Sequence, residues 1–358
     1  MSLKKSIIQK PYNHNYVANW RKMKYKIFVN IFLSCFIFFT NVSAQWKDIS
    51  KRFPANVKVF SITHNNYAIF AGTNDGVYKS IDEGLSWQGI NRKEFHSLIP
   101  KDAQHLELIC LSARGDTLFA GTNGLGVFIF DGYKWHLSTD GLEDETVSGD
   151  KPIPEAITYD QRNVYFGSKN GRIYILSDGD SSWNKSRIIS SGINSLLVKG
   201  DSILVGGSCS SHGIRQGCCL FLSTNQGNNW NNFDSTLGCQ IIYSLVTQNG
   251  TIYIGTGGEE SAIIKSIDNG KSWIRLVSNS EYPFHNVQSI IVRGDKVFAA
   301  TIGGLLFSND GGTHWVFIQH PTKKHKAFNL KSIFIAKTEI IAISPFELWS
   351  YPISSLIH

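Results

Sequence analysis

The chain has 358 residues, with 35 Lys or Arg against 28 Asp or Glu, and a formal net charge of +7. Residues 1–44 account for the whole excess, because they hold seven basic residues and no acidic one. Residues 45–358 are therefore electrically balanced, which argues against binding of nucleic acid. The glycine-rich segments lead into strands rather than helices, so no nucleotide or other cofactor is predicted.

Residues 1–44 have the parts of a secretory signal. Basic residues precede a largely apolar run over 27–39, and small residues then lead to Gln45. The apolar run is too short to cross a bilayer comfortably. We therefore expect export to the periplasm, the cell surface or the medium, with the membrane involved only if the signal stays uncleaved. Met23 is an alternative start site.

Seven tryptophans recur at intervals of 41 to 48 residues through the rest of the chain. Six of them end copies or shorter echoes of the phrase Ser-x-Asp-x-Gly-x-x-Trp, with Asn in place of Asp in one copy. The repeated residues are Ser80, Asp82, Gly84, Trp87, Asp131, Trp135, Asp178, Trp183, Ser223, Gly227, Trp230, Ser266, Asp268, Gly270, Trp273, Ser308, Asp310, Gly312 and Trp315. Repeats of this length are typical of β-propellers, in which each repeat forms one blade.

The first complete repeat shows the strands that such a blade needs. Short runs over 59–62 and 67–71 are rich in β-branched and aromatic residues. Turn residues separate them from further runs over 77–80 and 86–87. The second run ends on a small residue, here Gly72, which we expect where strands crowd together at the ring centre.

The two ends of the chain complement each other. Residues 330–335, 339–344 and 347–350 predict a first, second and third strand without a fourth. The run over 45–50, which contains Trp46, predicts a fourth strand without the first three. Joining the ends removes two free sheet edges. The sequence thus predicts an all-β fold, a single seven-bladed propeller of four-stranded antiparallel blades, closed by its N-terminal strand.

The repeated phrase resembles the Asp-box, or BNR repeat, of the sialidase-like superfamily of propellers. In size and layout the chain is similar to photosystem-assembly-factor-like and related WD40/YVTN/BNR-like secreted bacterial propellers, which hold a protein partner. The resemblance implies that the box residues are structural and lie away from the ligand-binding face. Their chemistry agrees, because Asp and Ser bond to turn backbone, Gly accepts a positive φ, and Trp packs between blades.

The segments between blades are longer and more varied than the hairpin turns, and we expect them on the opposite face. They are 88–105, 136–156, 184–192, 231–240, 274–287 and 316–329. Variable loops on a rigid scaffold suit a binding surface.

Cysteines gather in and near one insertion of the fourth blade. Cys209, Cys218 and Cys219 lie in it, and Cys239 begins the fifth blade. Export favours disulfides among these four residues, with free thiols or a metal site that includes His212 as alternatives. No metal is predicted, because adjacent cysteines without a C-x2-C pair fit a zinc site poorly.

Catalytic candidates are few. The sialidase Arg-Ile-Pro phrase is absent, since the nearest match runs Lys-Arg-Phe-Pro over 51–54. Seven-bladed Asp-box glycoside hydrolases use two carboxylates that face a cleft. The candidates of this kind are Glu259, Glu260 and the acidic run 143–145, with Arg215 and His285 as further candidates, and each is more simply a solvated loop residue.

The sequence is compatible with two functions. The favoured one is a monomeric, non-catalytic scaffold that binds a protein partner through its loop face. The alternative is a propeller that binds or hydrolyses extracellular glycans. A close carboxylate pair at the centre of the face would favour the glycan alternative. An aromatic or mixed-charge patch without such a pair would favour the scaffold.

Overall fold

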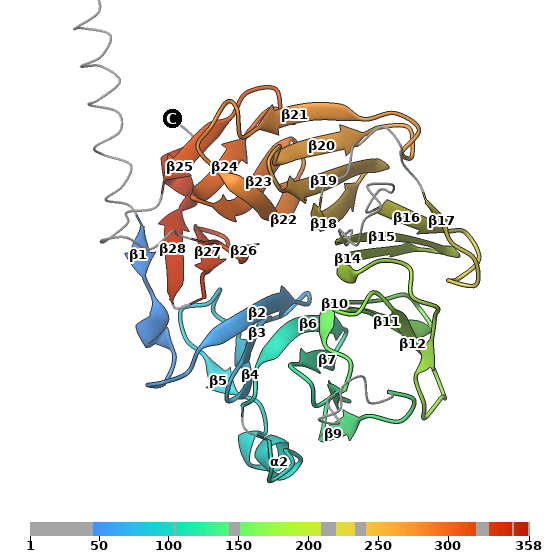
Figure 1. Cartoon of the computed structure of the whole chain (residues 1–358). Helices are drawn as coiled ribbons and strands as arrows, with labels where there is room; N and C mark the ends of the chain where they lie inside the picture. The colour runs from blue at the N-terminus through green and yellow to red at the C-terminus, as the bar shows by residue number, and fades with distance from the viewer. Residues whose placement is uncertain are drawn as a thin grey trace, which may run out of the picture. The chain divides into compact units, whose positions relative to one another are not determined.

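The computed structural model describes residues 46–103, 105–142, 151–208, 220–232, 241–319, 329–345 and 347–356. Within residues 46–358 these form seven four-stranded antiparallel sheets arranged in a ring (Figure 1). The chain is therefore a seven-bladed β-propeller, as the sequence predicted. Inside the described ranges, no helix is long and apolar enough to cross a membrane. The expected signal and the alternative start at Met23 lie outside the described residues.

The blades take their strands in chain order. Blade 1 contains β2 (Val59–His64), β3 (Ile69–Thr73), β4 (Gly76–Ser80) and β5 (Gln88–Gly89). Blade 2 contains β6 (Leu108–Arg114), β7 (Thr117–Thr122), β8 (Val127–Phe130) and β9 (Trp135–Ser138). Blade 3 contains β10 (Pro154–Tyr159), β11 (Asn163–Ser168), β12 (Ile173–Ser177) and β13 (Asn184–Lys185). Blade 4 contains β14 (Gly192–Lys199), β15 (Ser202–Ser208), β16 (Leu220–Ser223) and β17 (Asn231–Asn232).

The remaining three blades complete the ring. Blade 5 contains β18 (Ile241–Gln248), β19 (Thr251–Gly257), β20 (Ala262–Ser266) and β21 (Ile274–Ser278). Blade 6 contains β22 (His285–Arg293), β23 (Lys296–Ile302), β24 (Gly304–Ser308) and β25 (Val316–Gln319). Blade 7 contains β26 (Ser332–Ile335), β27 (Glu339–Ile343), β28 (Leu348–Pro352) and β1 (Lys47–Asp48). Two 3-10 turns, η2 (Ser50–Arg52) and η3 (Ile353–Leu356), follow β1 and β28.

Blade 7 joins the two ends of the chain, which confirms the predicted closure. In the antiparallel pair of β1 and β28, Lys47 lies opposite Ser350. The Ile49 N–H donates to the Leu348 carbonyl oxygen at 2.8 Å. The buried Trp46 ring contacts Tyr351, with 5.1 Å between the ring centroids. The first strand of the propeller therefore holds the last blade by both backbone bonds and packing.

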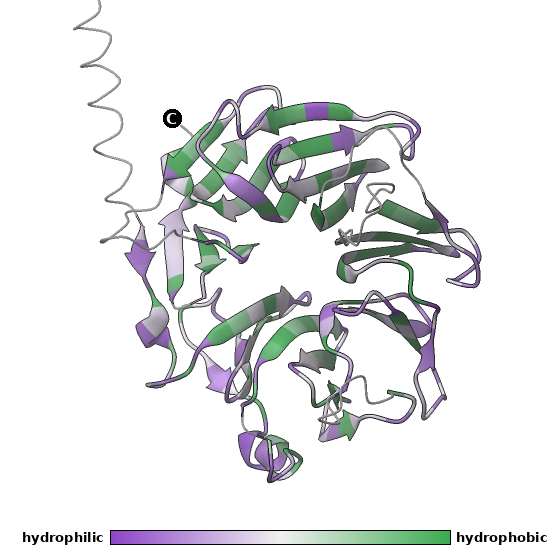
Figure 2. Ribbon diagram, in the orientation of Figure 1, coloured by the Kyte–Doolittle hydropathy of each residue, from purple (hydrophilic) through white to green (hydrophobic). Residues whose placement is uncertain are grey.

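The hydrophobic core lies between neighbouring blades. Phe70 and Val77 of blade 1, for example, pack with Leu108, Phe128 and Trp135 of blade 2 in one buried cluster. Figure 2 shows apolar residues concentrated in the strands of the blades, while the outer strands β1 and β5 are largely polar. Each blade thus buries its faces only when its neighbours are present, which explains why ring closure matters.

Small residues at the ends of the second strands allow this close packing. A Cβ atom on Gly121 would lie 2.6 Å from the Cys110 sulfur, and one on Gly255 would lie 2.7 Å from Val287 Cγ1. Real side chains do not approach so closely. The expectation of crowding at these positions is therefore confirmed.

One helix was not predicted from the sequence. Segment 88–105 contains α2 (Arg92–Ser97), which lies outside the ring in Figure 1. Its Phe95 is fully buried against Phe128, with 4.5 Å between ring centroids, and lies edge-on to Trp135 at 5.2 Å. A six-residue helix is too short to produce a periodic apolar pattern, so one buried aromatic residue decides its position.

Candidate functional site

The Asp-box turns of blades 1, 5 and 6 share a common set of hydrogen bonds. In blade 1, the Ser80 hydroxyl donates to Asp82 Oδ1 at 2.7 Å and accepts from the Gly84 N–H at 2.8 Å. Asp82 Oδ1 also accepts from the Ser86 N–H at 2.9 Å. The same bonds form around Ser266, Asp268, Gly270 and Ser272, and around Ser308, Asp310, Gly312 and His314. Hydrogen bonds from Ser86 and Ser80 lower the pKa of Asp82 to about 2.

The other copies keep part of this pattern. In blade 4, Asn225 replaces the acid, and its Oδ1 accepts from the Asn229 N–H at 2.9 Å. Asp131 accepts from two backbone N–H groups of its own turn, at 2.8 and 2.9 Å. Asp178 instead forms an ion pair with Arg114 of blade 2 at 3.0 Å. All of these contacts support turns or join blades, and the structural role of the box residues stays a prediction until a variant tests it.

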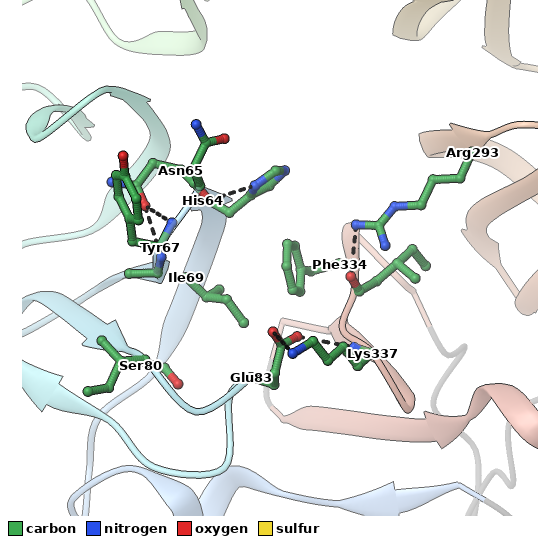
Figure 3. Close-up of a pocket in the computed structure, with 13 residues that line it drawn as sticks. His64, Asn65, Tyr67, Ile69, Ser80, Glu83, Arg293, Phe334 and Lys337 are labelled. Carbon is green, nitrogen blue, oxygen red and sulfur yellow. Dashed lines mark hydrogen bonds and ion pairs between the residues drawn. The ribbon is translucent and has the colours of Figure 1, made fainter.

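We call the face that carries the Asp-box turns the Asp-box face. A pocket of about 240 Å³ lies on this face between blades 7 and 1 (Figure 3). Its charged groups already have partners. Glu83 accepts a hydrogen bond from the Lys337 N–H at 3.1 Å, and the Lys337 ammonium lies 4.0 Å from the same carboxylate. Arg293 donates to the Ile335 carbonyl oxygen at 2.9 Å. These groups join blades to one another, so we do not choose this pocket as the candidate site.

A larger cavity of about 560 Å³ occupies the centre of the ring. The first strands of all seven blades, or the residues just before them, contribute to its lining. We call this cavity the channel. Its position on the axis brings side chains together that are far apart in the sequence.

A β-bulge recurs in the first strand of blades 1 to 6. Each bulge inserts one unpaired residue into the ladder, which turns its side chain away from the regular pattern. Lys331, just before β26, is the matching residue of blade 7, because it too precedes a small residue and then Ile or Leu. The seven matching residues all line the channel, and we call them the bulge ring: Phe60, Ile109, Glu155, Asn194, Tyr243, Gln288 and Lys331.

In blades 1, 2, 4 and 5 the small residue after the ring position bonds to the next blade instead. The Ser61 hydroxyl donates to the Leu108 carbonyl oxygen at 2.7 Å, and the Ser244 hydroxyl accepts from the Ile290 N–H at 3.0 Å. Cys110 is buried, and its sulfur lies 3.4 Å from a backbone carbonyl oxygen of blade 3. Burial raises the pKa of this thiol, so it stays protonated. The small residue therefore connects one blade to the next, whereas the bulge-ring residue before it lines the channel.

The uncharged members of the bulge ring form two arcs. Phe60 and Ile109, in neighbouring blades, make an apolar arc. Asn194, Tyr243 and Gln288, in three consecutive blades, make a polar arc. The Asn194 amide donates to the Ile242 carbonyl oxygen at 2.9 Å and to the Ser208 hydroxyl at 3.2 Å, which orients the side chain. Burial raises the pKa of Tyr243, so its hydroxyl remains a hydrogen-bond donor at neutral pH.

The charged members, Glu155 and Lys331, separate the two arcs. Glu155 keeps access to solvent in the channel, yet the protein around it raises the pKa of its carboxyl group. The Lys169 and Lys331 ammonium groups act in the opposite direction. In the described part of the chain, neither Glu155 nor Lys331 has a hydrogen bond or ion pair through its side chain. Glu107 supplies a second carboxylate to the channel lining.

The catalytic candidates from the sequence do not reach this site. Glu259 and Glu260 are exposed in the loop after β19, and Glu260 lies 3.4 Å from Arg275. His285 is exposed at the start of β22 and does not line the channel. Arg215, together with the acidic run and the four cysteines for which disulfides were expected, lies outside the described residues. No group of three or more potential metal ligands occurs within the ranges that the structure describes.

No family model matches this chain, and no curated protein matches it. Solved structures with a similar fold include the extracellular domain of BT4673 from B. thetaiotaomicron, with 16% identity and a TM-score of 0.61 over 86% of this chain. This chain spans about 40% of that one. YCF48 bound to D1 peptide has 17% identity and a TM-score of 0.61, covering 86% of this chain and 97% of its own.

PorZ, a bacterial surface component of the type-IX secretion system of Porphyromonas gingivalis, is a further structural neighbour. It has 14% identity and a TM-score of 0.60, and the match covers 84% of this chain and 47% of PorZ. At these identities the similarity shows a shared propeller fold and nothing about ligands.

Proposed function

We propose that this protein is an exported, non-catalytic propeller of the Asp-box type that binds a protein partner at the channel. The observation that carries the proposal is the bulge ring. Six blades give up regular strand pairing at the same position, and in each case the unpaired residue lines the channel. Bulges that re-aim a side chain are typical of functional sites.

The chemistry of the ring supports a protein ligand over a glycan. The ring combines an apolar arc, a polar arc and one charge of each sign, which is a mixed-charge surface rather than a cluster of like charges. YCF48 has been solved with a peptide bound, so one propeller of similar fold holds a peptide. Extracellular and surface proteins among the structural neighbours support export.

One observation favours the glycan alternative. Glu107 and Glu155 both line the channel, and the pKa of Glu155 is raised. A raised pKa on one of two carboxylates suits the general acid of a glycoside hydrolase. That function predicts hydrolysis of nitrophenyl glycosides by the purified protein, with loss of turnover in both Glu107→Gln and Glu155→Gln.

Site-specific photocrosslinking distinguishes these functions. A benzophenone amino acid replaces Phe60 or Tyr243 in the ring, and as matched controls Tyr67 or Tyr133 on the Asp-box face. The controls are 76% and 87% exposed, so they would capture any partner of that face. We expect a discrete protein crosslink in producing cells from the ring positions only. Crosslinks from the control positions alone, or glycoside turnover without any crosslink, would contradict the proposal.

A further inference from the structure

We propose that the bulge ring recognises an extended peptide segment with adjacent basic and acidic residues. Glu155 binds the basic side chain and Lys331 the acidic one. This inference rests on the proposed function, because it names the chemistry of the segment that the partner presents.

The positions of the two charges carry the first step. Glu155 lies in β10 of blade 3, and Lys331 directly precedes β26 of blade 7. Figure 1 shows β10 and β26 on opposite sides of the central opening. Successive side chains of an extended chain point to opposite sides. Neighbouring residues of opposite charge therefore reach the two walls at once.

The second step is that neither charged side chain makes a hydrogen bond or an ion pair within the described residues, although the Lys169 and Lys331 ammonium groups act on Glu155 at longer range. Burial alone raises the pKa of Glu155, and no described hydrogen bond compensates the carboxylate. A partly desolvated charge without a partner is unfavourable, and an oppositely charged ligand removes that cost. On the Asp-box face, by contrast, Glu83 accepts a hydrogen bond from the Lys337 N–H and lies 4.0 Å from the Lys337 ammonium group.

The arcs explain why the ligand is a peptide. The side-chain amide of Gln288 can donate and accept, as peptide C=O and N–H groups require. Asn194 offers its Oδ1 atom as an acceptor, because its amide N–H groups already bond to Ile242 and Ser208. Phe60 and Ile109 offer apolar surface to the aliphatic stem of a bound basic side chain. A polyanion would find one ring lysine facing it and would be repelled by Glu155. The ring thus matches a backbone with two opposite charges better than a ligand of one sign.

The test uses the chain from Gln45 onward and blocked synthetic peptides in isothermal titration calorimetry. The first peptide is acetyl-Ala-Ala-Lys-Glu-Ala-Ala-amide, and two further peptides replace its Lys by Met or its Glu by Gln. The protein variants are Glu155→Gln and Lys331→Met, with Glu259→Gln and Lys79→Met as controls at exposed positions away from the channel. Together they form two double-mutant cycles.

We expect about tenfold coupling between Glu155 and the peptide Lys, and between Lys331 and the peptide Glu. The crossed pairs and both control variants should show none. Glu155→Asp and Lys331→Arg should retain binding, which separates lost charge from lost folding. Cycles without coupling, or no binding of the first peptide at millimolar concentration, would overturn the inference.

A fourth peptide, with one Ala between Lys and Glu, places both charges on the same side of an extended chain. We expect it to bind about tenfold more weakly, and equal binding would overturn the arrangement across the channel. The calorimetric and crosslinking experiments test different claims. Ring crosslinks without coupling would leave the proposed function standing and remove only the peptide chemistry, whereas absent ring crosslinks would remove both.

Discussion

The Asp-box face and the bulge ring use similar residues in opposite ways. On the Asp-box face, Asp82 accepts bonds from its own turn, and the same residue types return in blade after blade. In the ring, Glu155 makes no described hydrogen bond or ion pair through its side chain, and each blade supplies a different residue at the matching position. We propose that the positions that repeat stabilise the fold, and that the bulge-ring position, which differs from blade to blade, binds the ligand.

Removing the N-terminal strand should have the largest effect, because both faces depend on a closed ring. A chain beginning at Lys51 loses the buried Trp46 and Ile49 and exposes the edge of β28. We expect a loss of at least about 4 kcal/mol in unfolding free energy, as for deletion of one buried Trp side chain. Thermal unfolding by circular dichroism measures it.

The matched control removes residues 354–358 at the other end. Its described part belongs to η3, which buries no residue, so the melting temperature should hardly change. If the N-terminal truncation also melted like the full domain, strand closure would not be what stabilises the ring.

Asp82→Ala tests whether the Asp-box face and the bulge ring have different roles. It removes the bonds to Ser80 and Ser86 and should lower stability by about 1 kcal/mol without changing peptide binding. Because the folded-state pKa is about 2, below its ordinary value of 3.8, this stability is present above that value and disappears as pH falls toward 2. Denaturant unfolding between pH 6 and pH 2 should show the variant and the wild type converging.

Asp116→Ala is the control, since Asp116 is exposed in a turn and has no described side-chain bond. It should change stability by less than about 0.5 kcal/mol. Weakened peptide binding by Asp82→Ala with unchanged stability would reverse the roles assigned to the two faces.

Glu155→Gln should increase stability, whereas Asp82→Ala should lower it. The raised pKa of Glu155 means that the folded state holds its proton more tightly than the unfolded chain. The free energy of unfolding therefore decreases as the pH rises from the ordinary pKa of glutamate through the raised pKa of Glu155. Above the raised pKa, the ionised carboxylate remains unfavourable in the folded state. The charges around Glu155 include Glu107, Lys169 and Lys331.

We accordingly expect the variant to be more stable at pH 7, by less than about 1 kcal/mol because the side chain keeps solvent contact. The same substitution should abolish coupling to the peptide Lys. A stability gain together with a binding loss is characteristic of a functional residue. Lower stability in Glu155→Gln would show that the carboxylate supports the fold.

Much of the fold follows from the sequence because its causes are local and repeated. The Trp spacing counts six boxes or echoes, and the complementary ends predict β1 in blade 7. The bulge ring is different, because a bulge depends on how two strands pair and leaves no distinctive composition. Alignment of the seven first strands on their small residue would have brought Glu155 and Lys331 into one column.

The smallest expected effect concerns the pocket between blades 7 and 1. Lys337 lies 4.0 Å from Glu83, and their side chains are 83% and 44% exposed, so this ion pair is well screened. Lys337→Ala should change stability by less than about 0.5 kcal/mol and leave peptide binding intact. Since the backbone N–H of residue 337 makes the stronger bond to Glu83, Glu83→Ala should cost more than Lys337→Ala. If Lys337→Ala weakened peptide binding as much as Lys331→Met, charge alone would decide affinity, and the unpaired state of the ring would not matter.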